Sequence, residues 1–453
     1  EGNLFEVPKL HLDYMLAHFD ALANDAAKSS ETMRDDNKRF ASLPKVVKAQ
    51  LKVDAAKSKA ISDKLIGVFF EDISYAADGG LYAELVQNRD FEYTSADHKG
   101  WSAITAWKSN APIRIATENP LSKNNPHYAV IAADTLYNEG WDGIVDRGAA
   151  YDFSIYARNI SGEKKELCVA LVAEDGNVMA EGKLKIVGKE WQRYTLALNT
   201  ANKKRTKMYG DKAVNCRLVV AGKKDATVAL DMISLFPHDT YKGHGLRKDL
   251  AEAIAELKPK FVRFPGGCMS HGQGIDNIYH WNHTIGPLQD RKPDKNIWNY
   301  HQTRGLGFYE YFQMCEDMGA EPLPVLAAGV PCQNSRANAE GYGGQQGGIP
   351  MSEMPAYCQE ILDMIEWANG DPATSKWAKM RADAGHPAPF NLKYVGVGNE
   401  DLISTDFEDR YLMICKAIKA KYPNIIVCGT VGPFHDPSSD YIEGWKFAKQ
   451  HSD

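Results

Sequence analysis

The chain has 453 residues, of which 44% are hydrophobic and 25% are charged, and its formal net charge is −6. This composition is typical of a folded globular protein with two or three domains. It does not favour a nucleic-acid-binding protein, because the one basic cluster, at 202–207, is short and more typical of a solvated turn. No apolar run approaches the roughly 18 residues that a membrane-spanning helix needs.

The cysteines and the start of the chain bear on its compartment. Eight cysteines are scattered without a CxxC pair or a dense framework, which predicts mostly buried thiols. The sequence shows no signal peptide and does not begin with Met, so we expect a cloned part, a processed form or a fragment. Processing of an exported protein favours an extracellular or periplasmic location over a cytoplasmic one.

The first hundred residues contain two different patterns. Residues 1–50 are polar and carry apolar residues at helical spacing, which predicts an N-terminal helical segment of one or two helices. These apolar residues are Leu12, Met15, Leu16, Phe19 and Leu22. Residues 51–99 contain an apolar run at 65–70 that stops on two acids and is followed by a glycine pair at 79–80. We interpret this stretch as the first strand and helix of the main fold.

Residues 100–240 have the pattern of an all-β domain. Short strand-like runs, several with period-two alternation, are separated by turns of Gly, Asn, Asp and Lys. This spacing predicts a β-sandwich inserted into the main fold, similar to carbohydrate-binding modules. Such a sandwich either binds sugar or serves only as a structural support.

Residues 241–453 alternate between amphipathic helices and nearly continuous apolar strands. With the run at 65–70, strands are expected at about 260–264, 323–327, 392–397 and 424–429. Repeated strand–helix units predict a parallel sheet buried on both faces. Polar residues follow the strand ends, where both (β/α)8 barrels and doubly wound sheets bind ligands. No GxGxxG follows a strand, which favours a (β/α)8 barrel, incomplete here with about five strands.

The fourth of these strands ends in Asn399 and Glu400. A glutamate enclosed by apolar strands loses hydration, so its pKa rises, and this suits a general acid near neutral pH. Asn399 can donate hydrogen bonds to a sugar hydroxyl. The alternative is that both residues simply cap the next helix.

Two further strand ends carry candidate residues. Glu71 follows the first strand, although on its own it could be a surface acid. Arg263 lies between apolar neighbours before a Pro-Gly-Gly sequence, so we expect it to point into the barrel mouth with a partner. It could orient a carboxylate such as Glu71 or contact a ligand. The two glycines allow a bound molecule to approach the backbone closely.

The segment 268–283 could be either a metal site or a loop. Cys268, His271, His280 and His283 have spacings that zinc sites use. The stretch is rich in aromatic residues, and no further ligand cluster supports a metal. We therefore expect a long loop at the barrel mouth and no metal.

Four segments together resemble one enzyme family. They are GVFFEDISYAADGGLYAELVQNRDFE, GLRKDLAEAIAELKPKFVRFPGGC, YHWNHTIGP and YVGVGNED. In order and spacing they resemble the family 51 glycoside hydrolases, mostly α-L-arabinofuranosidases, from about residue 64 to 453. The resemblance is to the branch that carries an inserted sandwich.

The resemblance implies a retaining glycoside hydrolase on a (β/α)8 barrel that needs no cofactor. It assigns the acid/base to Glu400 and sugar contacts to Glu71, Arg263 and Asn399. Many members have asparagine directly after Pro-Gly-Gly, whereas this chain has Cys268, so that contact is carried over only weakly. The expected substrates are arabinose-containing plant polysaccharides and oligosaccharides such as arabinan and arabinoxylan, cleaved in an exo fashion.

Retaining hydrolysis requires a second carboxylate about 5–5.5 Å from the first. In the resembled family this nucleophile ends the seventh strand, and the present chain has five. We therefore expect the nucleophile to lie outside this chain, in a second polypeptide or an omitted part, and assign neither Asp401 nor Glu71 to that role. A chain that truly ended at residue 453 would not be a competent hydrolase.

Two other functions remain open from sequence. The same fold could act endo on β-glucan or xylan, depending on whether the loop near 338–350 closes a pocket. A non-catalytic carbohydrate-binding fragment would explain the missing nucleophile. The expected partners are the glycan and either a second copy or a chain that completes the barrel, with no nucleic acid and no membrane.

Overall fold

The computed structural model describes residues 38, 40–44, 46, 48–161, 165–222, 227–333, 335, 345, 347–433 and 439–451. The chain divides into two compact units, residues 1–61 and 62–453. The described part of the first unit contains a short 3-10 helix, η2 (Ala55–Lys57), capped by the Asp54 side chain. The helical pattern expected at 12–22 lies outside the described residues.

The centre of the second unit is a parallel sheet of five strands. In order across the sheet they are β1 (Val68–Phe69), β13 (Phe261–Phe264), β16 (Glu321–Leu326), β17 (Tyr394–Val397) and β18 (Ile426–Cys428). Every neighbouring pair is parallel. All five lie where the apolar runs predicted them. Across the described residues, β1 and β18 form the two edges and the sheet does not close into a barrel.

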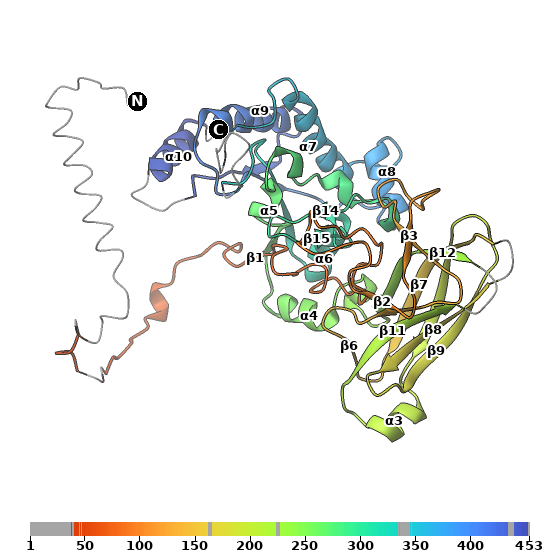
Figure 1. Cartoon of the computed structure of the whole chain (residues 1–453). Helices are drawn as coiled ribbons and strands as arrows, with labels where there is room; N and C mark the ends of the chain where they lie inside the picture. The colour runs from red at the N-terminus through yellow and green to blue at the C-terminus, as the bar shows by residue number, and fades with distance from the viewer. Residues whose placement is uncertain are drawn as a thin grey trace. The chain divides into compact units, whose positions relative to one another are not determined.

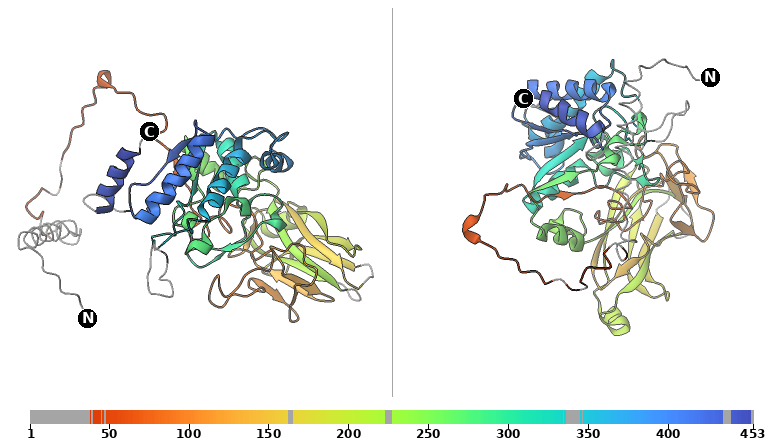
Figure 2. Two further views of the ribbon diagram at one scale, coloured as in Figure 1. Left: turned by 90° about the horizontal axis from the view of Figure 1, so that it is seen from above. Right: turned by 90° about the vertical axis from the view of Figure 1, so that its left-hand side faces the viewer.

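Helices follow the later strands of the sheet, as strand–helix units require. They are α4 (Lys248–Glu256), α5 (Cys268–His271), α6 (Phe308–Met318), α7 (Met354–Asn369), α8 (Lys376–Asp383), α9 (Thr405–Lys421) and α10 (Ser439–Gln450). The helix expected directly after the first strand, within 51–99, is not formed: residues 70–106 have turns, bends and bridges only. α7 and α9 lie side by side (Figures 1 and 2). The core between sheet and helices is aromatic: the Phe264 ring stacks on Tyr311 with centroids 4.8 Å apart. A cap at Ser404, whose side chain accepts the Phe407 N–H, starts α9.

Short elements fill the loops around the sheet. They are η3 (Tyr241–Gly243), η4 (Ile275–Asn277), η5 (Trp281–Thr284), η6 (Leu288–Asp290) and the paired strands β14 (Asp294–Lys295) and β15 (His301–Gln302). Within the described residues, no helix is both long and apolar enough to cross a membrane.

Residues 107–237 form two antiparallel sheets that pack on each other (Figure 1). One has the order β10 (Gln192–Asn199), β7 (Ala150–Asn159), β12 (Val228–Pro237), β4 (Tyr128–Ile131) and β3 (Arg114–Ala116). The other has the order β2 (Trp107–Ser109), β5 (Thr135–Asn138), β11 (Val214–Gly222), β8 (Lys165–Ala173) and β9 (Val178–Ile186), with β6 (Ile144–Asp146) also paired to β11. Alternating side chains such as Phe153, Ile155 and Leu218 are buried between them.

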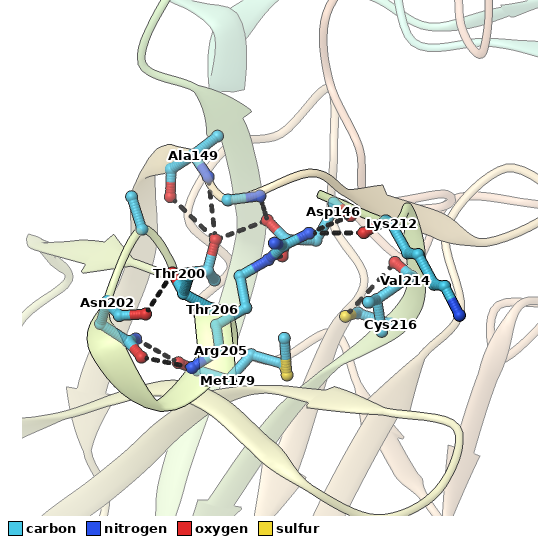
Figure 3. A network of polar contacts seen from close by, with 12 residues as sticks. Asp146, Ala149, Met179, Thr200, Asn202, Arg205, Thr206, Lys212, Val214 and Cys216 are labelled. Atoms are coloured by element: carbon cyan, nitrogen blue, oxygen red, sulfur yellow. Dashed lines mark hydrogen bonds and ion pairs between the residues drawn. The ribbon is translucent and has the colours of Figure 1, made fainter. Parts of the chain in front are cut away.

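A polar network closes one end of this sandwich (Figure 3). Asp146 is fully buried and accepts hydrogen bonds from Arg205 Nε at 2.8 Å, Tyr151 OH at 2.9 Å and the Gly148 N–H at 3.1 Å. Thr200 Oγ1 adds a contact of 2.5 Å. Arg205 belongs to α3 (Lys203–Tyr209), so the network fixes this helix to the sheet. Burial alone raises the pKa of Asp146, but these donors outweigh it and the net pKa is lowered.

Candidate active site

Glu400 lies in a tight turn directly after β17. Its backbone φ is +51°, a left-handed conformation that costs a residue with a side chain about 1 kcal/mol or more. Its carboxylate accepts a hydrogen bond from Gln333 Nε2 at 2.7 Å and a longer one from Asn399 Nδ2 at 3.4 Å. Cys268 Sγ lies 3.8 Å from the same oxygen. The turn therefore presents the carboxylate outward with amide donors beside it.

We expected apolar strands to enclose the Glu400 side chain. Among the described residues this prediction is wrong. The side chain is exposed, whereas its neighbour Asn399 is 8% exposed and buried. The strands on either side bury the backbone of the turn, but the carboxylate extends beyond their ends. The alternative of a helix cap is also wrong, because Ser404 caps α9.

Asn399 is held by Arg263. The guanidinium donates from Nη2 to Asn399 Oδ1 at 2.5 Å and lies over the Phe69 ring, 4.3 Å from its centroid. Burial lowers the pKa of Arg263, and the nearby charges of Glu71 and Glu400 oppose this shift. Arg263 thus lies beside Asn399, Asn399 beside Glu400, and the Gly266–Gly267 backbone lies between Glu71 and Asn399. The guanidinium of Arg263 donates its hydrogen bond to Asn399. The alternative that it orients Glu71 through such a bond is wrong.

Glu71 is held by backbone donors instead. Its Oε1 accepts the Gly267 N–H at 2.7 Å and the Met269 N–H at 3.2 Å. A Cβ on Gly266 would lie 2.7 Å from Glu71 Cγ, and one on Gly267 would lie 2.7 Å from Asn399 Oδ1. Because both residues lack a side chain, Glu71 and Asn399 can lie directly against the backbone of Gly266 and Gly267. The sequence had suggested only that a bound molecule would use this space.

A hollow of about 190 Å³ lies at the ends of these strands. Arg263, Asn399, Glu400, Gly398 and Thr430 are among the residues that line it. It is small compared with a typical ligand pocket of about 300–1,000 Å³. It nevertheless combines a carboxylate, an amide and a cation, which is chemistry suited to the hydroxyl groups of a sugar.

The four residues considered for zinc do not converge. His271 faces Asp401 with a nitrogen–oxygen distance of 3.1 Å, and His280 faces Glu360 at 2.9 Å. Burial lowers the pKa of His283 to about 4. Among the described residues there is no group of three or more side chains that could hold a metal ion. The eight cysteines all lie within the described ranges and form no disulfide; four are buried and four half-buried.

Sequence reasoning missed the buried layer beneath the site. Asp72, next to Glu71, is 2% exposed and accepts hydrogen bonds from the Ala77 N–H, Tyr300 OH and Gln302 Nε2. Burial and the charge of Asp78 raise its pKa to about 6. Gln333 was also missed. The contacts to Tyr300 and Gln302 bridge more than 200 residues of sequence, so no local spacing could reveal them.

The chain is similar in sequence to several known α-L-arabinofuranosidases. Residues 253–452 match the family model described as "Alpha-L-arabinofuranosidase 1 domain". An "Extracellular exo-alpha-L-arabinofuranosidase" of Streptomyces chartreusis is 41% identical, over 87% of this chain and 47% of its own length. Over most of its length the chain is similar to the family 51 α-L-arabinofuranosidases. "Alpha-L-arabinofuranosidase 1" of Arabidopsis thaliana, at 33% identity over 87% of this chain and 58% of its own length, extends the match.

A solved structure of the family gives the same fold. The arabinose-bound MgGH51 α-L-arabinofuranosidase superposes with a TM-score of 0.70 and 33% identity, over 83% of this chain and 60% of that one. The predicted fold class, a (β/α)8 barrel that is incomplete in this chain and carries an inserted β-sandwich, is therefore confirmed, as is the family resemblance. The chain spans about half the length of the relatives that it matches.

Proposed function

We propose that this chain carries the acid/base half of a retaining, exo-acting α-L-arabinofuranosidase. The observation that supports this most directly is the strained Glu400 turn at the end of β17, with Asn399 held by Arg263 beside it. The exposed carboxylate is reachable by a glycosidic oxygen. The named activity of the Streptomyces relative points to the same reaction.

Each residue has a proposed part. Glu400 protonates the leaving oxygen and then activates the water that releases the sugar from a glycosyl-enzyme. The two amide donors at its carboxylate, from Gln333 and Asn399, orient it for this proton transfer. Arg263, Asn399 and Glu71 contact the hydroxyl groups of the furanose. Cys268 lies near enough to Glu400 to line the same subsite.

The nucleophile is assigned to neither remaining acid of the site. Glu71 is occupied by two backbone N–H donors. Asp401 is 0% exposed and its Oδ2 accepts the Asn399 N–H at 2.9 Å. We propose that the second carboxylate is supplied by a further part of the protein or by another chain. Arabinose-containing plant glycans are the proposed substrates, and an extracellular location is proposed from the same relative.

The inserted sandwich is proposed as a domain of about residues 100–240, between barrel segments 51–99 and 241–453. Its contacts favour a supporting role. Asn125 Nδ2 donates to the carbonyl oxygens of Gln289 at 2.7 Å and Arg291 at 3.0 Å. These bonds attach the sandwich to the η6 segment. They are structural contacts and do not form a sugar-binding surface.

The deciding experiment incubates the protein with arabinoxylan and with linear β-glucan. We expect free arabinose from the first and no viscosity loss in the second. Rapid viscosity loss without arabinose would support the endo alternative. The Glu400→Gln variant should keep sugar binding and lose turnover. If wild type and variant bind equally and neither turns over in the longest form of the protein, the non-catalytic alternative is correct.

A further inference from the structure

Beneath the Glu400 turn lies a buried pair that the function above leaves without a role. Asp401 and His271 are both 0% exposed. Asp401 Oδ1 lies 3.1 Å from His271 Nε2, and Asp401 Oδ2 accepts the backbone N–H of Asn399 at 2.9 Å. The imidazole approaches outside hydrogen-bond geometry, so the Asn399 N–H is the well-aligned partner of this carboxylate. A buried carboxylate is costly unless it is paired or hydrogen-bonded, so the Asn399 N–H is an important partner of Asp401.

The carboxylate of Asp401 closes the turn that carries Glu400. Its bond to the Asn399 N–H spans the Glu400 backbone, which has the strained φ of +51°. Gly398, on the other side, has a φ of +84°, and a Cβ there would lie 2.1 Å from Asp401 Oδ2. The segment thus has room for the carboxylate only because residue 398 lacks a side chain. A left-handed residue persists where its surroundings hold it, and here Asp401 is that support.

His271 connects this turn to the neighbouring strand end. It is the last residue of α5, which begins directly after the glycines that follow β13. The same segment donates the Gly267 N–H to Glu71, and β13 carries Arg263, which bonds Asn399. The two buried side chains therefore pack the segment that holds Glu71 and Arg263 against the turn that holds Asn399 and Glu400.

We propose that Asp401 and His271 are positioning residues that fix the direction of the Glu400 carboxylate. This inference rests on the proposed function, in which Glu400 is the acid/base. Neither side chain touches the substrate. They act through the Asn399–Glu400 backbone, and a displacement of about 1 Å at a reacting group can cost on the order of 100-fold in rate.

The test compares two aryl α-L-arabinofuranosides that differ in their need for acid catalysis. A phenyl leaving group requires protonation, whereas a 2,4-dinitrophenyl group leaves without it. In the longest form of the protein, Asp401→Ala should lower kcat/KM, which reports formation of the glycosyl-enzyme, by about 10- to 100-fold for the phenyl substrate. This is part of the roughly 10²- to 10⁴-fold that general acid catalysis contributes. For the dinitrophenyl substrate kcat/KM should change by less than about 3-fold, because formation of the glycosyl-enzyme then needs no acid. Its kcat and KM should fall together, because Glu400 also activates the water that releases the sugar.

Conservative and control variants separate positioning from folding. Asp401→Asn keeps an oxygen that can accept the Asn399 N–H, so it should restore most of the lost rate. His271→Gln should give a smaller loss in the same direction, and it decides the test if Asp401→Ala does not fold. Asp146→Asn, a change at a buried aspartate of the sandwich, should affect both substrates equally and only through the folded fraction. An equal loss of kcat/KM on both substrates at position 401 or 271 would overturn the proposal.

A crystal structure tests the positioning role of Asp401 and His271 independently of catalytic activity. If the wild type turns over neither substrate, the proposed function fails, and a crystal structure of Asp401→Ala, or of His271→Gln if the first does not fold, decides the positioning role. Release of Glu400 from the left-handed region and loss of the Arg263–Asn399 bond would support it. An unchanged Glu400 turn would overturn it.

Discussion

Two buried aspartates in this chain are held in contrasting ways. Asp146 in the sandwich has four hydrogen-bond donors, including a guanidinium, and a lowered pKa. Asp401 in the site has one aligned backbone donor and an imidazole nearby. A carboxylate that accepts several hydrogen bonds stabilises its domain. A carboxylate with one aligned donor, placed in a strained turn, instead holds the backbone of that turn in position. The difference separates a structural network from a site network.

The largest effect should come from removing the structural acid. Asp146→Ala leaves Arg205, whose side chain is 4% exposed, as a buried charge without its carboxylate. Loss of one partner of a buried ion pair costs about 3–5 kcal/mol. Urea unfolding should show this loss, while the rate per folded molecule should be unchanged. A loss below about 1 kcal/mol would mean that the network in Figure 3 contributes little.

The second-largest effect should be the pH dependence of the free energy of unfolding, which differs between Asp72 near the site and Asp146 in the sandwich. The pKa of Asp72 is raised from 3.8 to about 6, so the folded state binds the proton more tightly than the unfolded state. Its contribution is present below about pH 4 and is lost as the pH rises to about 6, a change of about 3 kcal/mol. Asp146, with its lowered pKa, contributes in the opposite sense and loses its contribution in acid.

Urea unfolding of wild type and Asp72→Asn between pH 4 and pH 7 measures this change. The variant should lack the fall in stability between pH 4 and pH 6, even if its absolute stability is lower because an amide nitrogen cannot accept from Gln302. Parallel curves for the two proteins would contradict the assignment. The Asp146→Asn variant serves as the control that alters the acid side of the curve.

A smaller effect is expected at Gly398, the glycine before the Glu400 turn. Gly398→Ala places a Cβ at 2.1 Å from Asp401 Oδ2 on a residue with a φ of +84°. The strain should cost about 1–3 kcal/mol. Activity should fall more than stability, because the turn shifts with the carboxylate that closes it. Gly176→Ala, at a φ of +85° with open space around it, is the matched control for backbone strain alone.

The smallest effect is expected at the cap of α3. Asn202 accepts the Arg205 N–H at 3.0 Å through its side chain. Asn202→Ala should cost about 1 kcal/mol, as other cap losses do. Thermal unfolding would detect it, and additivity with Asp146→Ala tests whether cap and ion pair act as one unit. A combined loss well below the sum would show coupling through Arg205.

The strands of the sheet could be predicted from sequence because each is a nearly continuous apolar run that ends in polar residues. That rule also brought Glu71, Arg263, Asn399 and Glu400 to one edge, where the structure places them together. Their catalytic and sugar-binding roles stay predictions. His271 was noticed only as a metal candidate, because its real neighbour, Asp401, lies 130 positions away. The exposure of Glu400 could not be foreseen, since burial depends on which segments cover a strand end.

Chemical rescue tests most directly whether Glu400 is the acid/base. In the longest form of the protein, which supplies the nucleophile, the Glu400→Ala variant should form the glycosyl-enzyme from 2,4-dinitrophenyl α-L-arabinofuranoside and release it slowly, because no base activates water. Added azide needs no base, so it should restore turnover and yield the arabinofuranosyl azide with retained configuration. A variant that azide does not accelerate, or one as active as the wild type on the phenyl substrate, would contradict the assignment of Glu400.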